Sequence, residues 1–265
     1  MNGVRHFLLA LQFFTRVPVT GQLAGWVGFS PAMLRASAAH FPGIGWLVGA
    51  VGAGVFCVAQ VGLPGLAGAL VAAVLSTAAT VWMTGAFHED GLADVADGLG
   101  GSADRARALE IMKDSRIGAF GAIALVVALG LKIALLAALA GQGMPTVALA
   151  LVCAHVLSRL APLFLIRWLP YVGDEGAASK SKPLADAIGS GALLAGVMWS
   201  LPAAAWLLAA LGWMRGLAAM LLCALAALYI ARLLQRRLRG FTGDGLGATQ
   251  QICELAIYLA LAWQT

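Results

Sequence analysis

The stretch IGAFGAIALVVALGLKIALLAALA, residues Ile117–Ala140, carries one charged side chain, Lys132. An α-helix needs about 20 predominantly apolar residues to cross the hydrocarbon core of a bilayer. This stretch is long enough to do so, and it therefore predicts a membrane-spanning helix.

Similar apolar runs lie on both sides of it, and the last of them is short enough to be re-entrant or tilted at the interface. With this stretch included, the runs are Phe41–Leu63, Leu66–Phe87, Ile117–Ala140, Met144–Trp168, Gly191–Leu211, Gly216–Leu234 and Gln250–Trp263. We therefore predict an all-α integral membrane protein. It should be a polytopic bundle of about seven transmembrane helices that forms a single membrane domain over residues 1–265.

The composition of the whole chain agrees with a membrane bundle. Of its 265 residues, 61% are hydrophobic and 11% are charged, whereas an ordinary soluble domain is about 25% charged. The mean hydropathy is +0.89. These values exclude a soluble enzyme, a secreted disulfide scaffold and a disordered chain. The net charge of +5 is not arranged as a basic stripe interleaved with aromatic residues, so we expect the lipid bilayer, and no nucleic acid, as a partner.

The N-terminal segment precedes the first apolar run and has helical periodicity. Its apolar residues recur at helical spacing: Val4, Phe7, Leu8, Leu11 and Phe14. This pattern predicts an amphipathic helix that either lies in the membrane interface or packs on the bundle.

Basic residues gather in alternate loops. They are Arg5, Arg16 and Arg35, then Arg105, Arg107, Lys113 and Arg116, then Lys180 and Lys182, then Arg236, Arg237 and Arg239. The intervening turns are nearly bare of charge. The positive-inside rule then places the N-terminus and the charged loops in the cytoplasm.

The segment AFHEDGLADVADGLGG follows the second apolar run and is the most acidic part of the chain. Asp90, Asp94 and Asp97 are spaced i, i+4, i+7, so all three carboxylates share one face if the second span continues as a helix. Like charges at this spacing need a compensating cation, and oxygen ligands suit Mg²⁺ or Mn²⁺. His88 and Glu89 extend this cluster, and we predict a metal-dependent phosphoryl-transfer centre at the membrane surface. The alternative is a solvated acidic loop neutralised by Arg105 and Arg107.

Two further segments carry groups suited to phosphate. In MKDSRIGAFG, Lys113 and Arg116 can neutralise phosphate charge and Ser115 can donate a hydrogen bond, although the segment can also be a plain basic flank of the next span. In RGFTGDGLGATQQICE, polar side chains stand among glycines that can present backbone N–H groups; the alternative is an ordinary loop and helix cap. Its polar residues are Thr242, Asp244, Gln250 and Glu254. We expect Gln250 and Glu254, spaced i, i+4, to lie at the mouth of the last span.

A few polar residues lie inside the apolar runs themselves. They are Lys132, His155, Ser158 and Arg159. An intramembrane charge is a functional candidate by default, and Arg159 is expected to reach a phosphate from the cytoplasmic half of its run. We expect Lys132 to extend outward to the membrane surface, away from the acids.

Taken together, these segments resemble the cobalamin synthase family, the adenosylcobinamide-GDP ribazoletransferases. The resemblance is carried, in order, by LQFFTRVPV, HFPGIGWLVG, FHEDGLADVADGLGG, IMKDSRIGAFGA and GFTGDGLGATQQICE. It implies an inner-membrane, Mg²⁺-dependent enzyme that joins adenosylcobinamide-GDP to α-ribazole or α-ribazole 5′-phosphate and releases GMP.

For that reaction we expect a site built from the acidic and basic segments. The catalytic carboxylates are expected to be Asp90, Asp94, Asp97 and Asp244, with Glu89, Asp90, Asp94 and Asp97 as the metal ligands. The substrate or phosphate contacts are expected to come from Arg16, Lys113, Ser115, Arg116, Arg159, Thr242 and Gln250. One cytoplasm-facing cavity should bring the Asp90 and Asp244 segments together.

Two other classes of protein remain as alternatives. A CDP-alcohol phosphotransferase does analogous chemistry, but Gly101 and Ser102 stand where that pattern has Ala-Arg. A transporter would place carboxylates at bilayer depth, whereas the acids of this chain cluster in its charged loops.

Overall fold

The computed structural model describes residues 2–173 and 188–263, and in these residues every regular element is a helix. The loop with Lys180 and Lys182 lies outside the described residues. The elements are α1 Asn2–Phe14, α2 Gly21–Val27, α3 Pro31–Ser37, a 3₁₀ turn Ala38–His40, α4 Phe41–Gly62, α5 Gly65–Thr84, α6 Phe87–Gly101, α7 Arg105–Ile111, α8 Ala119–Ala140, α9 Met144–Ser158, α10 Ala161–Trp168, α11 Ser190–Leu211, α12 Trp213–Arg237 and α13 Gly243–Ala262.

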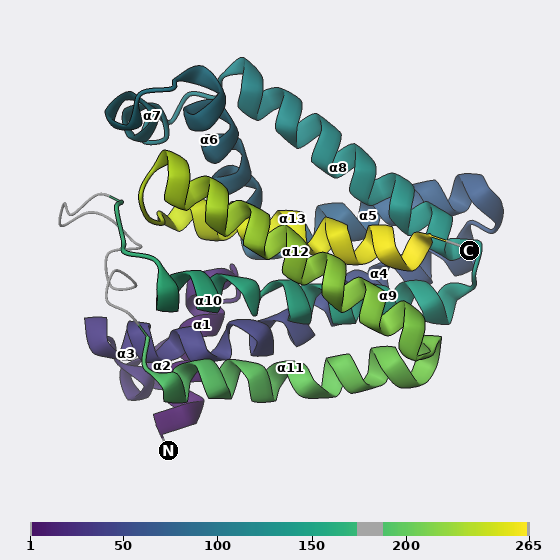
Figure 1. Ribbon diagram of the computed structural model, residues 1–265. Helices are drawn as coiled ribbons and strands as arrows, with labels where there is room; N and C mark the ends of the chain where they lie inside the picture. Colours follow the sequence, from purple (N-terminus) through teal and green to yellow (C-terminus); the bar gives the residue numbers. More distant parts are fainter. Residues whose placement is uncertain (1, 174–187, 264–265) are drawn as a thin grey trace.

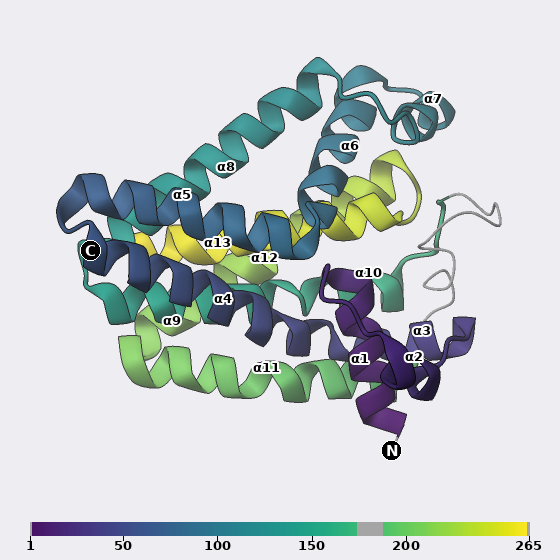
Figure 2. The same ribbon diagram turned by 180° about the vertical axis from the view of Figure 1, so that it is seen from behind.

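The long helices run roughly side by side, as Figures 1 and 2 show from opposite faces. Six helical segments of the described chain are long and apolar enough to cross a membrane, and the protein is therefore a multi-pass membrane protein. They are Pro31–Gly62, Gly65–Thr84, Ala119–Ala140, Met144–Trp168, Ser190–Leu211 and Trp213–Arg237. The predicted all-α polytopic bundle is confirmed.

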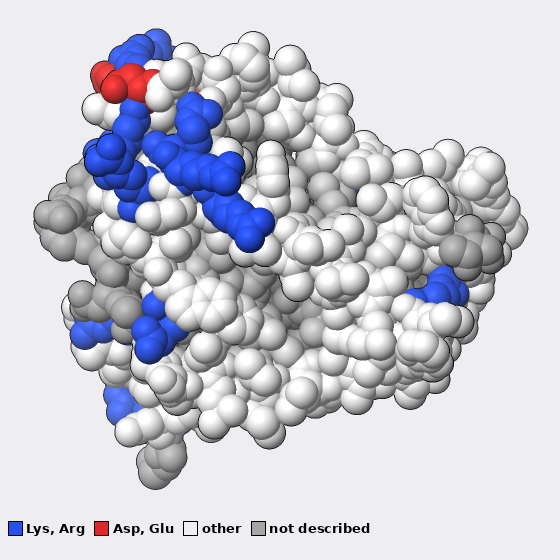
Figure 3. All heavy atoms as spheres, in the orientation of Figure 1, with Lys and Arg blue, Asp and Glu red and all other residues white. Residues whose placement is uncertain are grey.

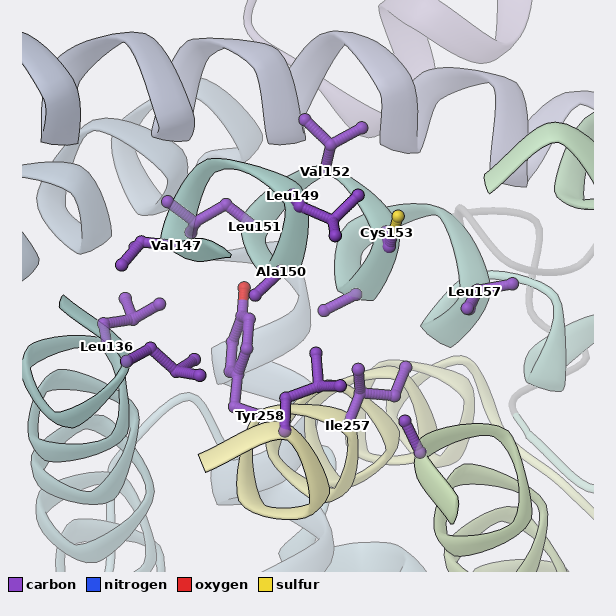
Figure 4. Close-up of a cluster of buried hydrophobic side chains, with 14 of the residues drawn as sticks. Leu136, Val147, Leu149, Ala150, Leu151, Val152, Cys153, Leu157, Ile257 and Tyr258 are labelled. Atoms are coloured by element: carbon purple, nitrogen blue, oxygen red, sulfur yellow. The ribbon is translucent and has the colours of Figure 1, made fainter. Parts of the chain in front are cut away.

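The seventh predicted run, Gln250–Trp263, belongs to α13, which starts earlier, at Gly243. Most of α13 is buried, and it lies in the middle of the bundle against α6, α8, α9 and α12. Figure 4 shows Tyr258 pointing from α13 toward α9 among buried side chains such as Leu151 and Leu136. The last run is therefore the core helix of the bundle.

Close backbone contacts hold α4 against α9. A Cβ on Gly45 would collide with the main chain of His155, and one on Gly49 would lie 2.7 Å from the Cα of Val152. Two glycines four residues apart let membrane helices approach closely, so that dispersion contacts replace the missing hydrophobic drive. This contact explains Gly45 and Gly49 of HFPGIGWLVG.

The charged loops gather at one end of the helices. Figure 3 shows Lys and Arg over the end that carries α7, while the lengths of the helices are white apart from a small basic group at the opposite end. That opposite end includes Arg215, which donates hydrogen bonds to Gln142 and to the carbonyl of Leu261. The uncharged sides suit lipid, and the charged end suits an aqueous face.

The N-terminal helix α1 packs its apolar face on this charged end, beside the start of α4 (Figure 2). Leu11 and Phe14 are buried, whereas Val4 is exposed. The rings of Phe14 and Phe41 lie 4.1 Å apart, edge to face. The predicted amphipathic helix is present, and it docks onto the bundle.

Candidate active site

The two acidic segments meet where α6 crosses the start of α13. A Cβ on Gly91 would lie 2.7 Å from the main-chain oxygen of Asp244, and one on Gly247 would lie 3.2 Å from that of His88. Only glycine permits this approach, and it places Asp244 beside the first turns of α6. The predicted meeting of the Asp90 and Asp244 segments is confirmed.

The second span does not continue into α6 as one helix. Gly85 and Ala86 both have positive φ, 68° and 58°, and the chain turns there before α6 begins at Phe87. The three aspartates nevertheless lie on one continuous helix, so the spacing argument still applies to them.

The carboxylates at this crossing repel one another. Burial raises the pKa of Asp94 to about 7, and the neighbouring Asp244, Asp90 and Asp97 carboxylates add to the shift. Burial and then Asp90 raise the pKa of Asp244 to about 6, although a hydrogen bond from Thr242 opposes the rise. Among the described residues, no Lys or Arg lies within ion-pair distance of Asp90, Asp94 or Asp244. We call these three residues the acid cluster.

The acid cluster fits a hard divalent cation that completes its coordination with substrate. Its potential metal ligands are all carboxylate oxygens, the kind that Mg²⁺ prefers. No Lys or Arg among the described residues is ion-paired with them, so a bound cation would compensate their negative charge. In the described part of the chain, no three His, Cys, Asp or Glu side chains are arranged closely enough to hold a metal ion by themselves. Mg²⁺ typically binds one or two carboxylates plus phosphate oxygens and waters, so an incomplete protein shell is the expected one.

Asp97 has a different task from the other two aspartates of α6. Its carboxylate accepts hydrogen bonds from the N–H groups of Gly118, at 2.7 Å, and Gly121, at 2.8 Å. It therefore caps the N-terminus of α8, where a negative charge is favourable. A Cβ on either glycine would collide with this carboxylate, which explains both glycines of RIGAFG.

Glu89, one residue before Asp90, faces the interior of the bundle. Its Oε1 accepts a hydrogen bond from Gln251 at 3.0 Å, and its Oε2 is buried without a partner. Gln251 also donates to Gln250 at 3.0 Å. The structure thus groups Glu89 with the buried polar side chains and separates it from Asp90 and Asp94.

These buried side chains form a network around Glu254, which is 1% exposed in the middle of α13. Lys132 Nζ lies 2.7 Å from Glu254 Oε1, and Tyr258 donates to the same oxygen at 3.0 Å. Gln250 donates to Oε2 at 2.7 Å, and His155 Nδ1 lies 3.3 Å from it. We call Lys132, His155, Gln250, Glu254 and Tyr258 the inner network.

Two sequence-based expectations were wrong here. Lys132 does not extend outward: it is 2% exposed and ion-paired inside the bundle. Glu254 does not lie at the mouth of a span, because α13 begins eleven residues before it. Each residue supplies the charge that the other needs in order to be buried.

Arg159 stands at the break between α9 and α10. It is 3% exposed, its NH1 donates to the carbonyl of His155 at 2.9 Å, and its Nε is buried without a hydrogen-bond partner. With Gln250 it lines a small cavity at the charged end of the bundle. The structure therefore brings these two predicted substrate contacts together.

The other predicted phosphate contacts lie in different surroundings. Arg116 is exposed and ion-paired with Asp114 at 2.6 Å, and this pairing lowers the pKa of Asp114 to about 2. Lys113 and Ser115 are exposed on the same loop. Among the described residues, no hydrogen bond or ion pair joins Arg116 to Asp90, Asp94 or Asp244.

Arg16 and Thr242 lie closer to the aspartates. A Cβ on Gly85 would lie 3.0 Å from Arg16 Nε, so this side chain covers the turn that leads into α6. Thr242 is the N-cap of α13 and accepts a hydrogen bond from the N–H of Gly245 at 3.0 Å. The cap fixes the first turn of α13, and hence the position of Asp244.

The fold and the site define a polytopic membrane protein with an acid-rich site where two helices cross at its charged end. The family model described as cobalamin-5-phosphate synthase matches residues 6–262. The chain belongs to this family.

Curated relatives match over nearly their whole length. The chain is 57% identical to a protein of Polaromonas naphthalenivorans over 99% of both chains, and 57% identical to one of Albidiferax ferrireducens over 98% of both. It is 50% identical to a protein of Leptothrix cholodnii over 98% of this chain and 95% of the relative. All three are named adenosylcobinamide-GDP ribazoletransferase. No solved structure matches the chain.

Proposed function

We propose that this protein transfers the cobinamide phosphate of adenosylcobinamide-GDP to a ribose hydroxyl of α-ribazole or α-ribazole 5′-phosphate. The hydroxyl oxygen forms the new bond to the cobinamide-side phosphorus, the pyrophosphate bond breaks, and GMP leaves. The products are adenosylcobalamin or adenosylcobalamin 5′-phosphate. The family match and the names of the relatives favour this reaction over a CDP-alcohol phosphotransferase and over a transporter.

The observation that carries the proposal is the acid cluster. Three carboxylates from two helices are packed together without a basic partner among the described residues, an arrangement that costs folding energy unless a ligand brings positive charge. Asp90, Asp94 and Asp244 would hold Mg²⁺ or Mn²⁺. The metal, when bound, would neutralise charge on the pyrophosphate oxygens. Asp97 and Glu89 would not bind the metal. Asp97 would cap α8, and Glu89 would link α6 to the inner network through Gln251.

A carboxylate of the acid cluster can act as the general base that accepts the proton of the attacking hydroxyl. A general base works best when its pKa is near the operating pH, and burial with mutual repulsion brings the pKa of Asp94 to about 7 and that of Asp244 to about 6. Either carboxylate can accept this proton. Arg16 beside the turn that leads into α6, and Lys113 and Arg116 on the exposed loop, would hold phosphate oxygens.

We place the charged end of the bundle in the cytoplasm and the protein in the inner membrane. The asymmetry of basic residues supports this orientation, since most Lys and Arg side chains visible in Figure 3 gather at the end of the bundle that carries α7. A cysteine introduced at Ser102 should react with an impermeant reagent in inverted vesicles only. Labelling in right-side-out vesicles alone would reverse the orientation.

The reaction is tested directly with purified protein in detergent or liposomes. Protein supplied with Mg²⁺, an α-ribazole acceptor and adenosylcobinamide-GDP should release GMP. A CDP-linked alcohol with a lipid acceptor should release no CMP. Release of CMP without release of GMP would overturn the proposal in favour of a CDP-alcohol phosphotransferase.

A further inference from the structure

An apolar groove lies on the side of the bundle between α11 and α12, and α10 forms its base. Figure 1 shows α11 and α12 diverging from the turn at Gly212 toward the charged end. The volume of the groove is about 450 Å³, within the range of about 300–1,000 Å³ that is usual for ligand sites. Leu201 and Leu228 line the groove and are exposed, so it opens to the surroundings of the bundle.

The wall of the groove offers a ligand almost nothing but hydrocarbon. On α12 the lining residues recur every three or four positions, so one face of this helix meets the groove. They are Met220, Cys223, Ala224, Ala227, Leu228 and Ala231. The one hydroxyl among the described lining residues, that of Ser200, donates to the carbonyl of Gly196 in its own helix at 2.9 Å. The part of a ligand that enters the groove is therefore apolar.

Aromatic and basic side chains lie where the groove reaches the charged end. Trp168, in the last turn of α10, lines the groove and is exposed, and Trp is enriched at the level of the lipid headgroups. Arg167 directly precedes it, and Arg232 lies one helical turn beyond Leu228 on α12. Both arginines are exposed, and neither is ion-paired within the described part of the chain. We call Arg167 and Arg232 the basic rim.

A phospholipid of negative charge fits both the groove and the basic rim. The helices α10, α11 and α12 belong to membrane-spanning segments, so the groove lies beside lipid. Lipid chains are as apolar as the wall, so an acyl chain gains packing contacts in the groove but no hydrophobic driving force. The preference among lipids must therefore come from the headgroup, and arginines near the membrane surface attract anionic lipids.

A second copy of the chain fits this face less well. A two-fold dimer in a membrane keeps the same end of both copies on the same side of the bilayer. Contact through the groove would then place two basic rims of like charge at one level. An anionic lipid instead compensates the charge of the rim.

We infer that the groove binds an acyl chain of an anionic glycerophospholipid whose phosphate lies at Arg167 and Arg232. The lipid site is formed by the end of α9 and by α10, α11 and α12, and no residue of the acid cluster lines it. It is therefore separate from the proposed transfer site.

Native mass spectrometry of protein released from lipid nanodiscs tests the role of the headgroup. From nanodiscs with equal amounts of phosphatidylglycerol and phosphatidylcholine, wild type should retain one phosphatidylglycerol. Arg167→Gln and Arg232→Gln should each lower the ratio of bound phosphatidylglycerol to phosphatidylcholine about fivefold. Arg107→Gln is the matched control: this exposed arginine lies on α7 and is ion-paired with Glu110, so its loss should leave the ratio unchanged.

Filling the groove tests the role of the acyl chain. Ala224 is an exposed lining residue, so Ala224→Trp should place its ring in the groove and abolish the retention of lipid. Leu225→Trp is the control, because Leu225 is the next residue of α12, is exposed and does not line the groove. This variant should retain the lipid as wild type does.

Four results would overturn the inference. They are equal retention of both lipids by wild type, an unchanged lipid ratio in both arginine variants, retained lipid in Ala224→Trp, and loss of lipid from both tryptophan variants. A wild-type dimer that Ala224→Trp dissociates would also overturn it, in favour of a second copy in the groove. None of these variants alters the acid cluster, so GMP release tests the proposed function separately.

Discussion

Neighbouring acidic residues on α6 and α13 have opposite surroundings. Asp90, Asp94 and Asp244 crowd together at the charged end without a basic partner among the described residues, whereas Glu254 lies inside the bundle with Lys132 at 2.7 Å. Glu89 and Asp90 are adjacent in sequence, yet Glu89 is buried and bonded to Gln251 beside the inner network, whereas Asp90 belongs to the acid cluster. Carboxylates that repel one another at an accessible crossing indicate a ligand site, and a paired carboxylate in a dry interior indicates a structural role.

The largest effect on stability should come from the inner network. Glu254→Ala leaves Lys132 as an unpaired buried charge, and we expect a loss of about 3–5 kcal/mol of stability. Glu254→Gln keeps polar partners for Tyr258 and Gln250 and should cost less. Thermal unfolding in detergent measures both variants. A Tm for Glu254→Ala equal to that of wild type would mean that the ion pair does not support the fold.

The acid cluster should show the opposite behaviour. Asp94→Asn should lower kcat by about a hundredfold or more, because a metal-binding carboxylate contributes several kcal/mol to the transition state. The Tm should stay equal or rise, since a repulsive charge is removed. Glu110→Gln is the control, because this exposed acid on α7 is ion-paired with Arg107 and lies outside the acid cluster. A fall in the Tm of Asp94→Asn with unchanged kcat would mean that the acid cluster supports the fold and does not take part in catalysis.

The exposed loop should show an intermediate effect. Arg116→Ala should lower kcat/KM roughly ten- to a hundredfold through the loss of a charge-assisted phosphate contact, and Arg116→Lys should recover part of it. Arg107→Ala offers a matched control, because Arg107 is also exposed and ion-paired with a nearby acid, Glu110. Equal kinetics for the Arg116 and Arg107 variants would remove Arg116 from the site.

The smallest effect concerns pH in metal-free protein. The pKa of Asp94 is about 7 in the folded state against 3.8 for the free side chain, so the folded state binds more protons between these values. Stability should therefore fall as pH rises from about 4 to 7 and then level off. Asp94→Asn should flatten this slope, as measured by Tm against pH. A slope that is identical in the variant would assign it to other groups.

Much of the fold follows from the sequence, because spanning helices need long apolar runs and the charged loops interrupt them. The aspartates at i, i+4, i+7 and the Gly-rich start of α13 also pointed to the site. The placement of Lys132 did not follow, since α8 is apolar on all sides and its partner Glu254 is distant in sequence. No sequence pattern shows which face of such a helix meets lipid.

The separate roles of neighbouring acids also depend on tertiary structure. Asp97 looks equivalent to Asp90 and Asp94 in the sequence, and it becomes a cap only because the loop before α8 returns to α6. The small cavity beside Arg159 is lined by Phe14, Phe41 and Phe87, which come from the three helices α1, α4 and α6. The signal available beforehand was the presence of Arg159 inside an apolar run.

The central claim is that the acid cluster is a metal-dependent transfer site. The most direct measurement follows Mn²⁺ binding by electron paramagnetic resonance together with GMP release, in wild type and in an Asp90→Asn, Asp94→Asn double variant. In the presence of adenosylcobinamide-GDP, wild type should bind Mn²⁺, release GMP in proportion to the bound Mn²⁺, and lose activity in EDTA. The folded double variant should neither bind Mn²⁺ nor release GMP. Full GMP release in excess EDTA, or unchanged Mn²⁺ binding in the double variant, would contradict the claim.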